Sequence, residues 1–380
     1  MSSGSAPKPD VDWRHMRADP VPMLDLKHET TELRADLLAA FNRVLDSGQF
    51  VLGSEVAAFE AEAAALLGVK HAIGVNSGTD ALTISLRALG IGPGDEVITS
   101  PFSFFATGEC IALVGATPVF VDIEPESFNI DPGLIRAAIT PRTKAILPVH
   151  LYGLPADMGR IMKVARDHDL FVIEDAAQSF GARWHGDPAA PYTGTIGHMS
   201  AFSFYPTKNL GAYGDAGMIT TNDDELALLA RKLRSHGSLV AYQNEMLGYN
   251  SRLDELQAAI LRVKLPSLER MNRERRETAR LYTEALAGKP GITAPATAPG
   301  HIYHQYTVRI ERDRDSFREQ LLAAGVSSSV YYPRLVNELL GMGPAADFPV
   351  ARAAAGSVLS LPLPRRVEER ERVIGALEGL

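Results

Sequence analysis

Seven short apolar runs, most of them separated by helical patterns, constrain the fold of this 380-residue chain. The runs are AIGV (72–75), EVITS (96–100), PVFVDI (118–123), KAILPVH (144–150), LFVIEDAA (170–177), MSAFSF (199–204) and GMITT (217–221). Near-continuous apolar strands that alternate with helices indicate a mostly parallel sheet covered on both faces. We therefore expect an α/β fold whose chemistry lies in the loops that follow the carboxyl ends of the strands.

The sequence before and after these alternating strands and helices has a different pattern of predicted elements. Residues 33–66 have the pattern of two amphipathic helices divided by a turn, and a long charged helix is predicted over 253–286. Loops, a strand (YHQYTVRI), a helix (RDSFREQLLAAG), a second strand (VSSSVYY) and a last helix (EERERVIGALEG) follow. This predicts a disordered tail over 1–20, a large domain over 21–250 and a smaller C-terminal α/β domain over 251–380.

Charge and cysteine content narrow the class of protein. The net charge of -8 does not indicate a basic surface that could bind a polyanion, so we expect no nucleic-acid partner. The single cysteine, Cys110, excludes an intrachain disulfide and a multi-cysteine metal site, and no metal is expected. Neither a run of membrane-spanning length nor a secretory signal is present, so we expect no membrane partner and a cytoplasmic location.

The first strand end that carries chemistry is VNSGTDAL. AIGV ends there, and Asn76-Ser77-Gly78-Thr79 opens a helix. Backbone N–H groups at a helix start, with a glycine that allows close approach, form an anion site. The alternative is an ordinary helix cap by Ser77 or Thr79.

The next two strand ends carry an acid and a lysine. FVIEDAAQS ends in Glu174-Asp175, and a carboxylate there is costly without a partner, unless it caps a following helix. SFYPTKNLG places Lys208 just after the next strand, and Ser203 at that strand's end is a candidate anion ligand. A partly buried lysine has a lowered pKa and acts as a nucleophile, whereas the alternative is an ordinary surface lysine.

These three features together match the needs of one cofactor. Pyridoxal 5'-phosphate requires N–H donors for its phosphate, a carboxylate for its pyridine nitrogen and a lysine for its aldehyde. SGTDAL, EDAAQS, SFYPTKNLGAYGDAG and GYNSRLDELQAA resemble, in order and spacing, the DegT/DnrJ/EryC1/StrS family of nucleotide-sugar aminotransferases. The resemblance extends from about Pro22 to the C-terminus. It implies the fold type I aminotransferase fold, with a seven-stranded mostly parallel sheet, a smaller C-terminal α/β domain and active sites at a homodimer interface.

The resemblance assigns roles around the cofactor ring. Lys208 is similar to the Schiff-base lysine, which is the catalytic residue, and Asp175 to the acid that pairs with the pyridine nitrogen. Gln178 corresponds to a side chain that lies against the ring. Phe104, in SPFSFFAT, matches the aromatic residue that stacks on it, and the alternative for Phe104 is core packing.

The resemblance also assigns phosphate and substrate contacts. Gly78, Thr79 and Ser203 match phosphate ligands of the same subunit, and Asn250 in GYNSRL matches one that comes from the neighbouring subunit. Positions that line the sugar pocket are matched by Tyr205 and His304, and the alternative for His304 is a hydrogen-bonded loop histidine.

The chain departs from the family pattern in two places. It reads GDAG at 214–217 where many members read GEGG, and YYPRLVNELLGM lacks the histidine that often follows the YP pair. The KNLGAYGDAG form resembles members that aminate C3 of a keto-sugar.

The activity implied by the resemblance is transfer of an amino group from L-glutamate to a nucleotide-linked keto-sugar of the dTDP-3-keto-6-deoxyhexose type. Four alternatives remain open at this point. They are amination of a UDP-linked 3-keto-hexuronate, dehydration by a sugar dehydratase of the same fold, action on an amino acid alone as a lyase or decarboxylase, and a non-catalytic regulatory role.

Overall fold

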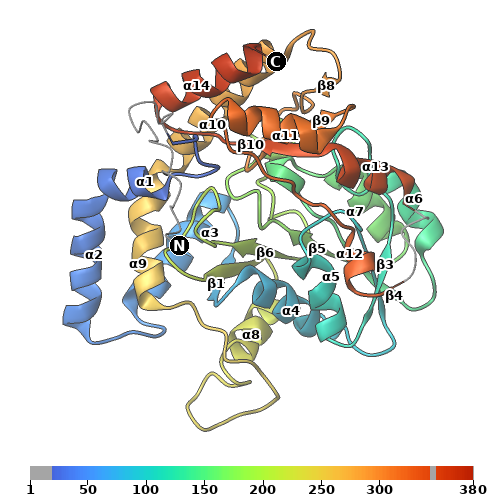
Figure 1. Cartoon of the computed structure of the whole chain (residues 1–380). Coiled ribbons are helices and arrows are strands. Elements are labelled where there is room, and N and C mark those ends of the chain that lie inside the picture. The colour runs from blue at the N-terminus through green and yellow to red at the C-terminus, as the bar shows by residue number, and fades with distance from the viewer. Residues whose placement is uncertain (1–18, 343–347, 380) are drawn as a thin grey trace, which may run out of the picture.

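A central seven-stranded sheet organises the computed structural model, which describes residues 19–342 and 348–379 (Figure 1). The strand order is β1-β7-β6-β5-β4-β2-β3. The strands are β1 (His71–Val75), β2 (Glu96–Thr99), β3 (Thr117–Phe120), β4 (Thr143–Leu147), β5 (Phe171–Asp175), β6 (Met199–Ser203) and β7 (Gly217–Thr221). Each predicted apolar run contributes one strand, so the predicted α/β fold is confirmed. The predicted tail at 1–20 lies, except for its last two residues, outside the described residues.

The direction of the strands brings several of their ends to one edge. All neighbouring pairs from β3 to β6 are parallel, and only β7 runs antiparallel to its neighbours β6 and β1. The carboxyl ends of β1, β4, β5 and β6 therefore lie at the same edge as the start of β7. This edge is where the sequence predicts the chemistry.

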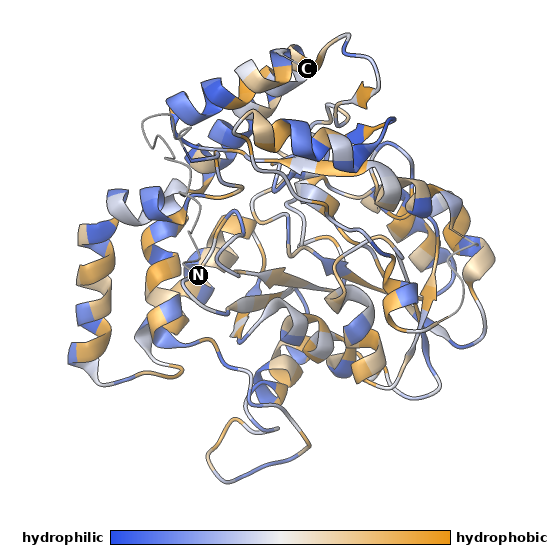
Figure 2. Cartoon of the chain, in the orientation of Figure 1, coloured by the Kyte–Doolittle hydropathy of each residue, from blue (hydrophilic) through white to orange (hydrophobic). Residues whose placement is uncertain are grey.

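Both faces of the sheet are buried. In β5, Ile173 packs into one hydrophobic cluster and its neighbour Val172 into another. Because successive side chains of a strand point to opposite faces, the two clusters lie on opposite sides of the sheet. Figure 2 shows hydrophobic residues concentrated along the strands and on the inward sides of the helices.

Helices surround the sheet and form most of the periphery (Figure 1). They are α1 (Leu26–Glu32), α2 (Arg34–Ser47), α3 (Ser54–Leu67), α4 (Gly78–Ala88), α5 (Ala106–Leu113), α6 (Pro132–Ile135), α7 (Met158–Asp167), α8 (Asp224–Leu233), α9 (Glu255–Lys264), α10 (Leu268–Leu286), α11 (Arg314–Ala323), α12 (Val336–Leu339), α13 (Pro349–Ser357) and α14 (Val367–Glu378). Within the described part of the chain, none of them is both long and apolar enough to cross a bilayer.

The prediction of one continuous helix over 253–286 is wrong. The structure divides it into α9 and α10, with a 3₁₀ turn at Leu265–Ser267 between them. Pro266 lies in this turn. A proline has no backbone N–H and its ring clashes with the preceding turn, so a continuous α-helix is broken there.

A second sheet has three antiparallel strands in the order β10-β9-β8: β8 (Ile292–Thr293), β9 (Tyr306–Ile310) and β10 (Val358–Leu361). The predicted strand at 326–332 is wrong, because this segment makes only isolated bridges, through Val326 and Ser329. The strands that pair with β9 are β8 and β10, and sequence reasoning missed both. Residues 331 and 332 instead line a cavity at the edge of the large sheet.

Candidate active site

A cavity of about 590 Å³ lies at the edge of the sheet where β1, β5 and β6 end and β7 begins. The structure brings nine of the ten predicted site residues to its walls. They are Gly78, Thr79, Phe104, Asp175, Gln178, Ser203, Tyr205, Lys208 and His304. Residues from distant parts of the sequence meet here because parallel strands deliver their ends to one edge.

The start of α4 forms one end of the cavity. Ser77 caps the helix, because its hydroxyl accepts a hydrogen bond from the amide of Asp80 at 3.1 Å. Among the described residues, the amides of Gly78 and Thr79 have no backbone partner, and both residues line the cavity. A Cβ on Gly78 would lie 2.8 Å from the Cβ of Ser203, so only glycine allows β6 to approach this closely. The cap is present, and the predicted anion site stays a prediction that these two amides are placed to serve.

Asp175 ends β5 and is buried beside the cavity. Its Oδ2 accepts a hydrogen bond from the Thr107 hydroxyl at 2.8 Å, and its Oδ1 accepts one from the amide of Ala177 at 3.2 Å. Burial raises the pKa of Asp175, although both hydrogen bonds and the positive charge of Lys208 act in the opposite direction. A turn rather than a helix follows, so the helix-cap alternative for Asp175 is wrong.

Lys208 follows the turn that leaves β6. Its amide donates to the carbonyl of Tyr205 at 2.8 Å, which folds the chain back toward the cavity. Its side-chain amine has no hydrogen bond or ion pair within residues 19–342 and 348–379. Burial lowers the pKa of this amine to about 8, and the nearby carboxylate of Asp175 offsets only part of the effect. A neutral amine is therefore accessible near neutral pH, and Lys208 is not an ordinary surface lysine.

A free amine, a buried carboxylate and exposed helix amides around one cavity form an unusual combination. Residues 31–378 match the DegT/DnrJ/EryC1/StrS aminotransferase family, which is nearly the whole chain. The chain belongs to this family.

Two relatives and one solved structure illustrate the similarity. The chain is 47% identical over 365 residues to a dTDP-3-amino-3,4,6-trideoxy-alpha-D-glucose transaminase from Streptomyces venezuelae, covering 94% of this chain and 95% of the relative. It is 46% identical over 355 residues to a UDP-N-acetyl-3-dehydro-alpha-D-glucosamine 3-aminotransferase from Acidithiobacillus ferrooxidans, covering 92% and 95%. The crystal structure of S. venezuelae DesV with a ketimine intermediate has a TM-score of 0.91 and 47% identity, covering 95% and 98% of the two chains.

This aminotransferase is therefore a pyridoxal-phosphate-dependent enzyme of fold type I. The residues present fit the cofactor: a free amine for the aldehyde, a buried carboxylate for the pyridine nitrogen, and helix amides with a glycine cradle for the phosphate. When bound, the cofactor supplies an aldehyde that captures amines and a ring that withdraws electrons.

Gln178 is held rigidly on one wall of the aminotransferase cavity. Its Oε1 accepts a hydrogen bond from the amide of Tyr152 at 2.6 Å, and its Nε2 donates to the hydroxyl of Tyr332 at 3.0 Å. Burial raises the pKa of Tyr332. Both hydrogen bonds fix the orientation of the amide plane, so a ligand meets a preorganised wall.

His304 has a defined hydrogen-bonding pattern. Its Nδ1 lies 3.2 Å from Oδ1 of Asn209, whose Nδ2 donates to Oδ1 of Asn272 at 2.8 Å. Since Asn209 presents an acceptor to the ring, Nδ1 of His304 carries the proton and Nε2 is an acceptor. Burial, reinforced by the positive charges of Lys208 and Arg275, lowers the pKa of His304 well below its usual value. The imidazole is therefore neutral. It is hydrogen-bonded and lines the cavity, and its contact with a sugar stays a prediction.

The three exposed residues among the predicted site residues differ in their position relative to the cavity. Phe104 is 56% exposed and lies 6.1 Å from the ring of Tyr332, so the core-packing alternative for Phe104 is wrong. Tyr205 is also exposed at the cavity. Asn250 does not line the cavity of its own chain and is exposed, with its backbone paired to Ser235.

Sequence reasoning missed Thr107, Tyr331 and Tyr332. Thr107 is a buried hydroxyl among the mostly apolar residues of helix α5, and this contrast is the one signal that the sequence offers for it. The tyrosines were assigned to a strand, although the YYP sequence gives a proline signal against that assignment.

The neighbouring acid Glu174 has a different role from Asp175. It accepts hydrogen bonds from the amides of Gly194, Ile196 and Gly197 and pairs with His150 at 2.9 Å. Burial alone would raise the pKa of Glu174, but the His150 contact and the backbone amides hold it below its usual value. Glu174 therefore joins the 194–197 loop to His150, which follows β4.

Proposed function

We propose that this aminotransferase moves an amino group from L-glutamate to the C3 keto group of a nucleotide-linked sugar, in the dTDP-3-keto-6-deoxyhexose class. The observation that carries the proposal is the amine of Lys208, which has no partner among the described residues and a pKa near 8, beside Asp175 in a cavity lined by Phe104, Tyr205 and Tyr332. The choice of C3 is supported by both relatives described above, whose names specify amination at that carbon.

In this proposal Lys208 is the catalytic residue. It holds the cofactor aldehyde between turnovers, and its released Nζ then takes the proton from the α-carbon of the donor. The same amine returns a proton to the sugar carbon in the second half of the reaction. Because burial keeps its pKa close to physiological pH, both protonation states are available to Lys208.

The remaining residues bind and orient. Asp175 pairs with the pyridine nitrogen, and Gln178 and Phe104 hold the two sides of the ring. Gly78 and Thr79 donate their amides to the phosphate.

Ser203 adds a hydroxyl to the phosphate site of the cofactor. The substrate is contacted by Tyr205 and by the neutral Nε2 of His304, which bind the sugar. A fixed acceptor at His304 favours a sugar hydroxyl there.

A homodimer is part of the proposal, because the predicted contact from Asn250 needs a second copy. The loop between α8 and α9 projects from the body at the lower edge of Figure 1 and carries Tyr242 and Leu247, which are 100% and 89% exposed. Figure 2 also shows hydrophobic residues along α2, where Leu38 and Phe41 are exposed. Exposed apolar side chains of this kind are typical of surfaces that another chain covers.

The dimer has a direct test. Lys208→Ala and Asn250→Ala variants are each expected to be nearly inactive, whereas a refolded mixture regains activity. A mixed dimer has one site in which the intact Lys208 and the intact Asn250 meet. A monomer in analytical ultracentrifugation with full activity would contradict the shared site.

The function itself is tested with a panel of nucleotide-linked 3-keto-sugars, supplied with pyridoxal phosphate and L-glutamate. The expected result is formation of 2-oxoglutarate and of an amino sugar by mass spectrometry, and loss of both in Lys208→Ala. Absence of amine transfer to every sugar would overturn the proposal.

A UDP-linked 3-keto-sugar, including the hexuronate, is the second candidate, and relatives whose names give UDP-linked 3-keto-sugars favour it. The two candidates are separated by the ratio of kcat/KM for dTDP-linked and UDP-linked members of the same panel. We propose a cytoplasmic location for either.

A further inference from the structure

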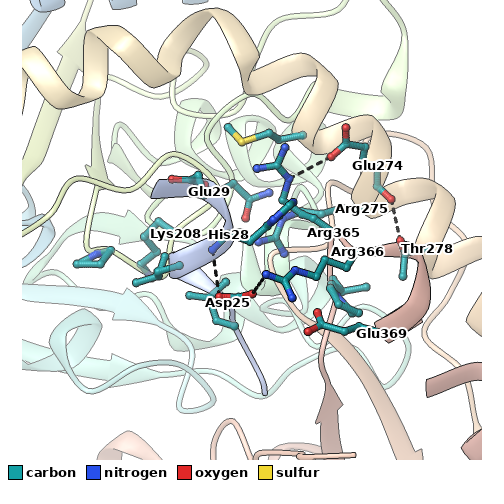
Figure 3. A pocket seen from close by; sticks show the side chains of 17 residues that line it. Asp25, His28, Glu29, Lys208, Glu274, Arg275, Thr278, Arg365, Arg366 and Glu369 are labelled. Atoms are coloured by element: carbon teal, nitrogen blue, oxygen red, sulfur yellow. Dashed lines mark hydrogen bonds and ion pairs between the residues drawn. The ribbon is translucent and has the colours of Figure 1, made fainter. Parts of the chain in front are cut away.

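The two sides of Lys208 are closed by different kinds of contact. On one side, shown in Figure 3, charged side chains of α1, α10 and the segment that leads into α14 pack together, and Arg365 pairs with Glu274 at 3.3 Å. The other side is the active-site cavity, where hydrogen bonds between uncharged groups join the walls. One buried residue outside the cavity lining, Tyr152, contacts three of the segments that form these walls.

Tyr152 has an unusual backbone conformation. Its φ is +57° and its ψ is 10°, in the left-handed region that a bulky residue seldom adopts, and Gly153 follows with a φ of +89°. A Cβ on Gly153 would lie 3.0 Å from the carbonyl oxygen of Gln178 and 3.0 Å from the amide nitrogen of His304, so glycine is needed where these segments cross. Strained residues persist where surrounding contacts fix them, and they are concentrated at functional sites.

The amide and the hydroxyl of Tyr152 contact two different walls of the cavity. The amide donates to Oε1 of Gln178 at 2.6 Å, and the hydroxyl donates to the carbonyl of Tyr331. Nε2 of Gln178 donates in turn to the hydroxyl of Tyr332 at 3.0 Å, and Tyr332 is the next residue after Tyr331. Three hydrogen bonds therefore form a closed network through these four residues, which we call the Tyr152 network.

The carbonyls of the same strained turn hold a third wall. The carbonyl of Tyr152 accepts a hydrogen bond from the amide of Gln305 at 3.4 Å, and that of Gly153 accepts one from the amide of Ile302 at 3.1 Å. Gln305 lines the cavity next to His304. One turn after β4 thus contacts the Gln178 turn, the 302–305 segment and the 331–332 segment.

The direction of each hydrogen bond in the Tyr152 network is fixed. Because the Tyr152 amide can only donate, the oxygen of Gln178 faces it and the nitrogen of Gln178 faces Tyr332. Burial raises the pKa of Tyr152 well above its usual value, Tyr332 adds to this effect, and the Thr307 hydroxyl acts against it. The hydroxyl of Tyr152 therefore keeps its proton and remains a donor at neutral pH.

We propose that Tyr152 is a positioning residue of the active site, which holds Gln178 and the 331–332 segment at fixed places around the cofactor. Both hydrogen bonds start from one rigid residue, so these two walls cannot shift independently. Tyr152 acts through the residues that it holds. The contact between Gln178 and the cofactor ring rests on the proposed function.

Tyr152→Phe tests this role, because it keeps the aromatic ring that packs 5.9 Å from Phe128 and removes only the hydroxyl. The variant is loaded with pyridoxal phosphate. We expect the dissociation constant of the cofactor to rise about three- to tenfold. We also expect the circular dichroism of its visible band to decrease, because Gln178 then has no fixed orientation beside the ring.

Tyr282→Phe is the matched control. The hydroxyl of Tyr282 is also buried and also donates to a main-chain carbonyl, that of Pro362 at 3.0 Å, but Tyr282 lies in the hydrophobic cluster that includes the three-stranded sheet. Its loss should lower the thermal midpoint by an amount similar to that in Tyr152→Phe. The affinity for the cofactor and its circular dichroism should stay at the values of the parent.

Tyr332→Phe breaks the same network at another hydrogen bond. Because residues of one network do not act independently, the double variant with Tyr152→Phe should lose no more affinity for the cofactor than the weaker-binding single variant. Parent-like affinity and dichroism in Tyr152→Phe, an equal loss of cofactor in Tyr282→Phe, or losses that multiply in the double variant would overturn the inference. None of these measurements uses a sugar, so a failure of amine transfer in the sugar panel would contradict the proposed function alone.

Discussion

Two lysines of this enzyme, the partly buried Lys208 and the buried Lys264, differ in what their amines contact. Lys264, at the end of α9, donates to the carbonyl of Gly211, pairs with Glu29 and lies 5.0 Å above the ring of Tyr213. Lys208 precedes Gly211 by three residues and has no such partner among the described residues. Burial lowers the pKa of both amines.

The difference teaches that burial alone does not make a lysine reactive. The charge of Lys264 is matched by Glu29, so this residue fastens α1 to the loop after Lys208. The amine of Lys208 faces a cavity, and within the described part of the chain the charge of Asp175 is what stabilises its protonated form. The lysine whose amine lacks a carboxylate partner among the described residues is therefore the one that we expect to react.

Loss of Lys208 should give the largest effect on activity. Lys208→Ala removes both the cofactor attachment and the proton carrier, so kcat should fall at least about a thousandfold. The thermal midpoint should not fall, because no described contact of the amine is lost. Residual turnover within tenfold of the parent would contradict the assignment.

Loss of Lys264 should instead affect stability. Lys264→Met leaves Glu29 buried without its partner, which should cost about 3–5 kcal/mol in the free energy of unfolding. The control is the double variant Glu29→Gln with Lys264→Met, which should recover part of the loss in a denaturant titration. Equal losses in the single and double variants would show that the pair does not act as a unit.

Asp175→Asn tests how much the charge of this carboxylate contributes to the pKa and the activity of Lys208. Removing its charge should lower the pKa of Lys208 below 8, because Asp175 is the group that raises it. It should also cut kcat by about a hundredfold or more, since the charge that faces the cofactor ring is lost. Steady-state kinetics and the pH dependence of amine labelling measure the two effects, and an unchanged pKa of Lys208 would contradict the coupling.

Thr107→Val should have the smallest effect. It removes the 2.8 Å hydrogen bond to Asp175, worth about 1–2 kcal/mol, and should raise the pKa of that carboxyl further. We expect a loss of kcat of a few fold to about tenfold, with recovery in Thr107→Ser. A Ser variant as slow as the Val variant would point to packing rather than to the hydroxyl.

The sequence predicted the features that depend on local pattern. All seven strands of the large sheet came from apolar runs, and Asp175 and Lys208 stood out as polar groups at strand ends. Thr107 and Tyr332 could not be found in this way, because their roles depend on contacts with residues 68 and 154 positions away.

Two errors in the fold have local causes. The 326–332 segment has strand-like composition, but it makes only isolated bridges and its tyrosines line the cavity. The prediction of one long helix over 253–286 did not take Pro266 into account. A proline inside a helical pattern is a known signal for a break.

The central claim is that the partly buried amine of Lys208 has no partner among the described residues, whereas the buried amine of Lys264 has one. Amine-selective labelling of the cofactor-free protein across pH 6–11, read by mass spectrometry, tests it directly. A pKa near 8 leaves about a tenth of the Lys208 amine neutral at pH 7 and about nine tenths at pH 9, so its labelling should rise through pH 8. Lys264 should resist labelling until the protein unfolds. Labelling of Lys208 with a midpoint near 10.5, or labelling of Lys264 as fast as that of Lys208, would contradict the account.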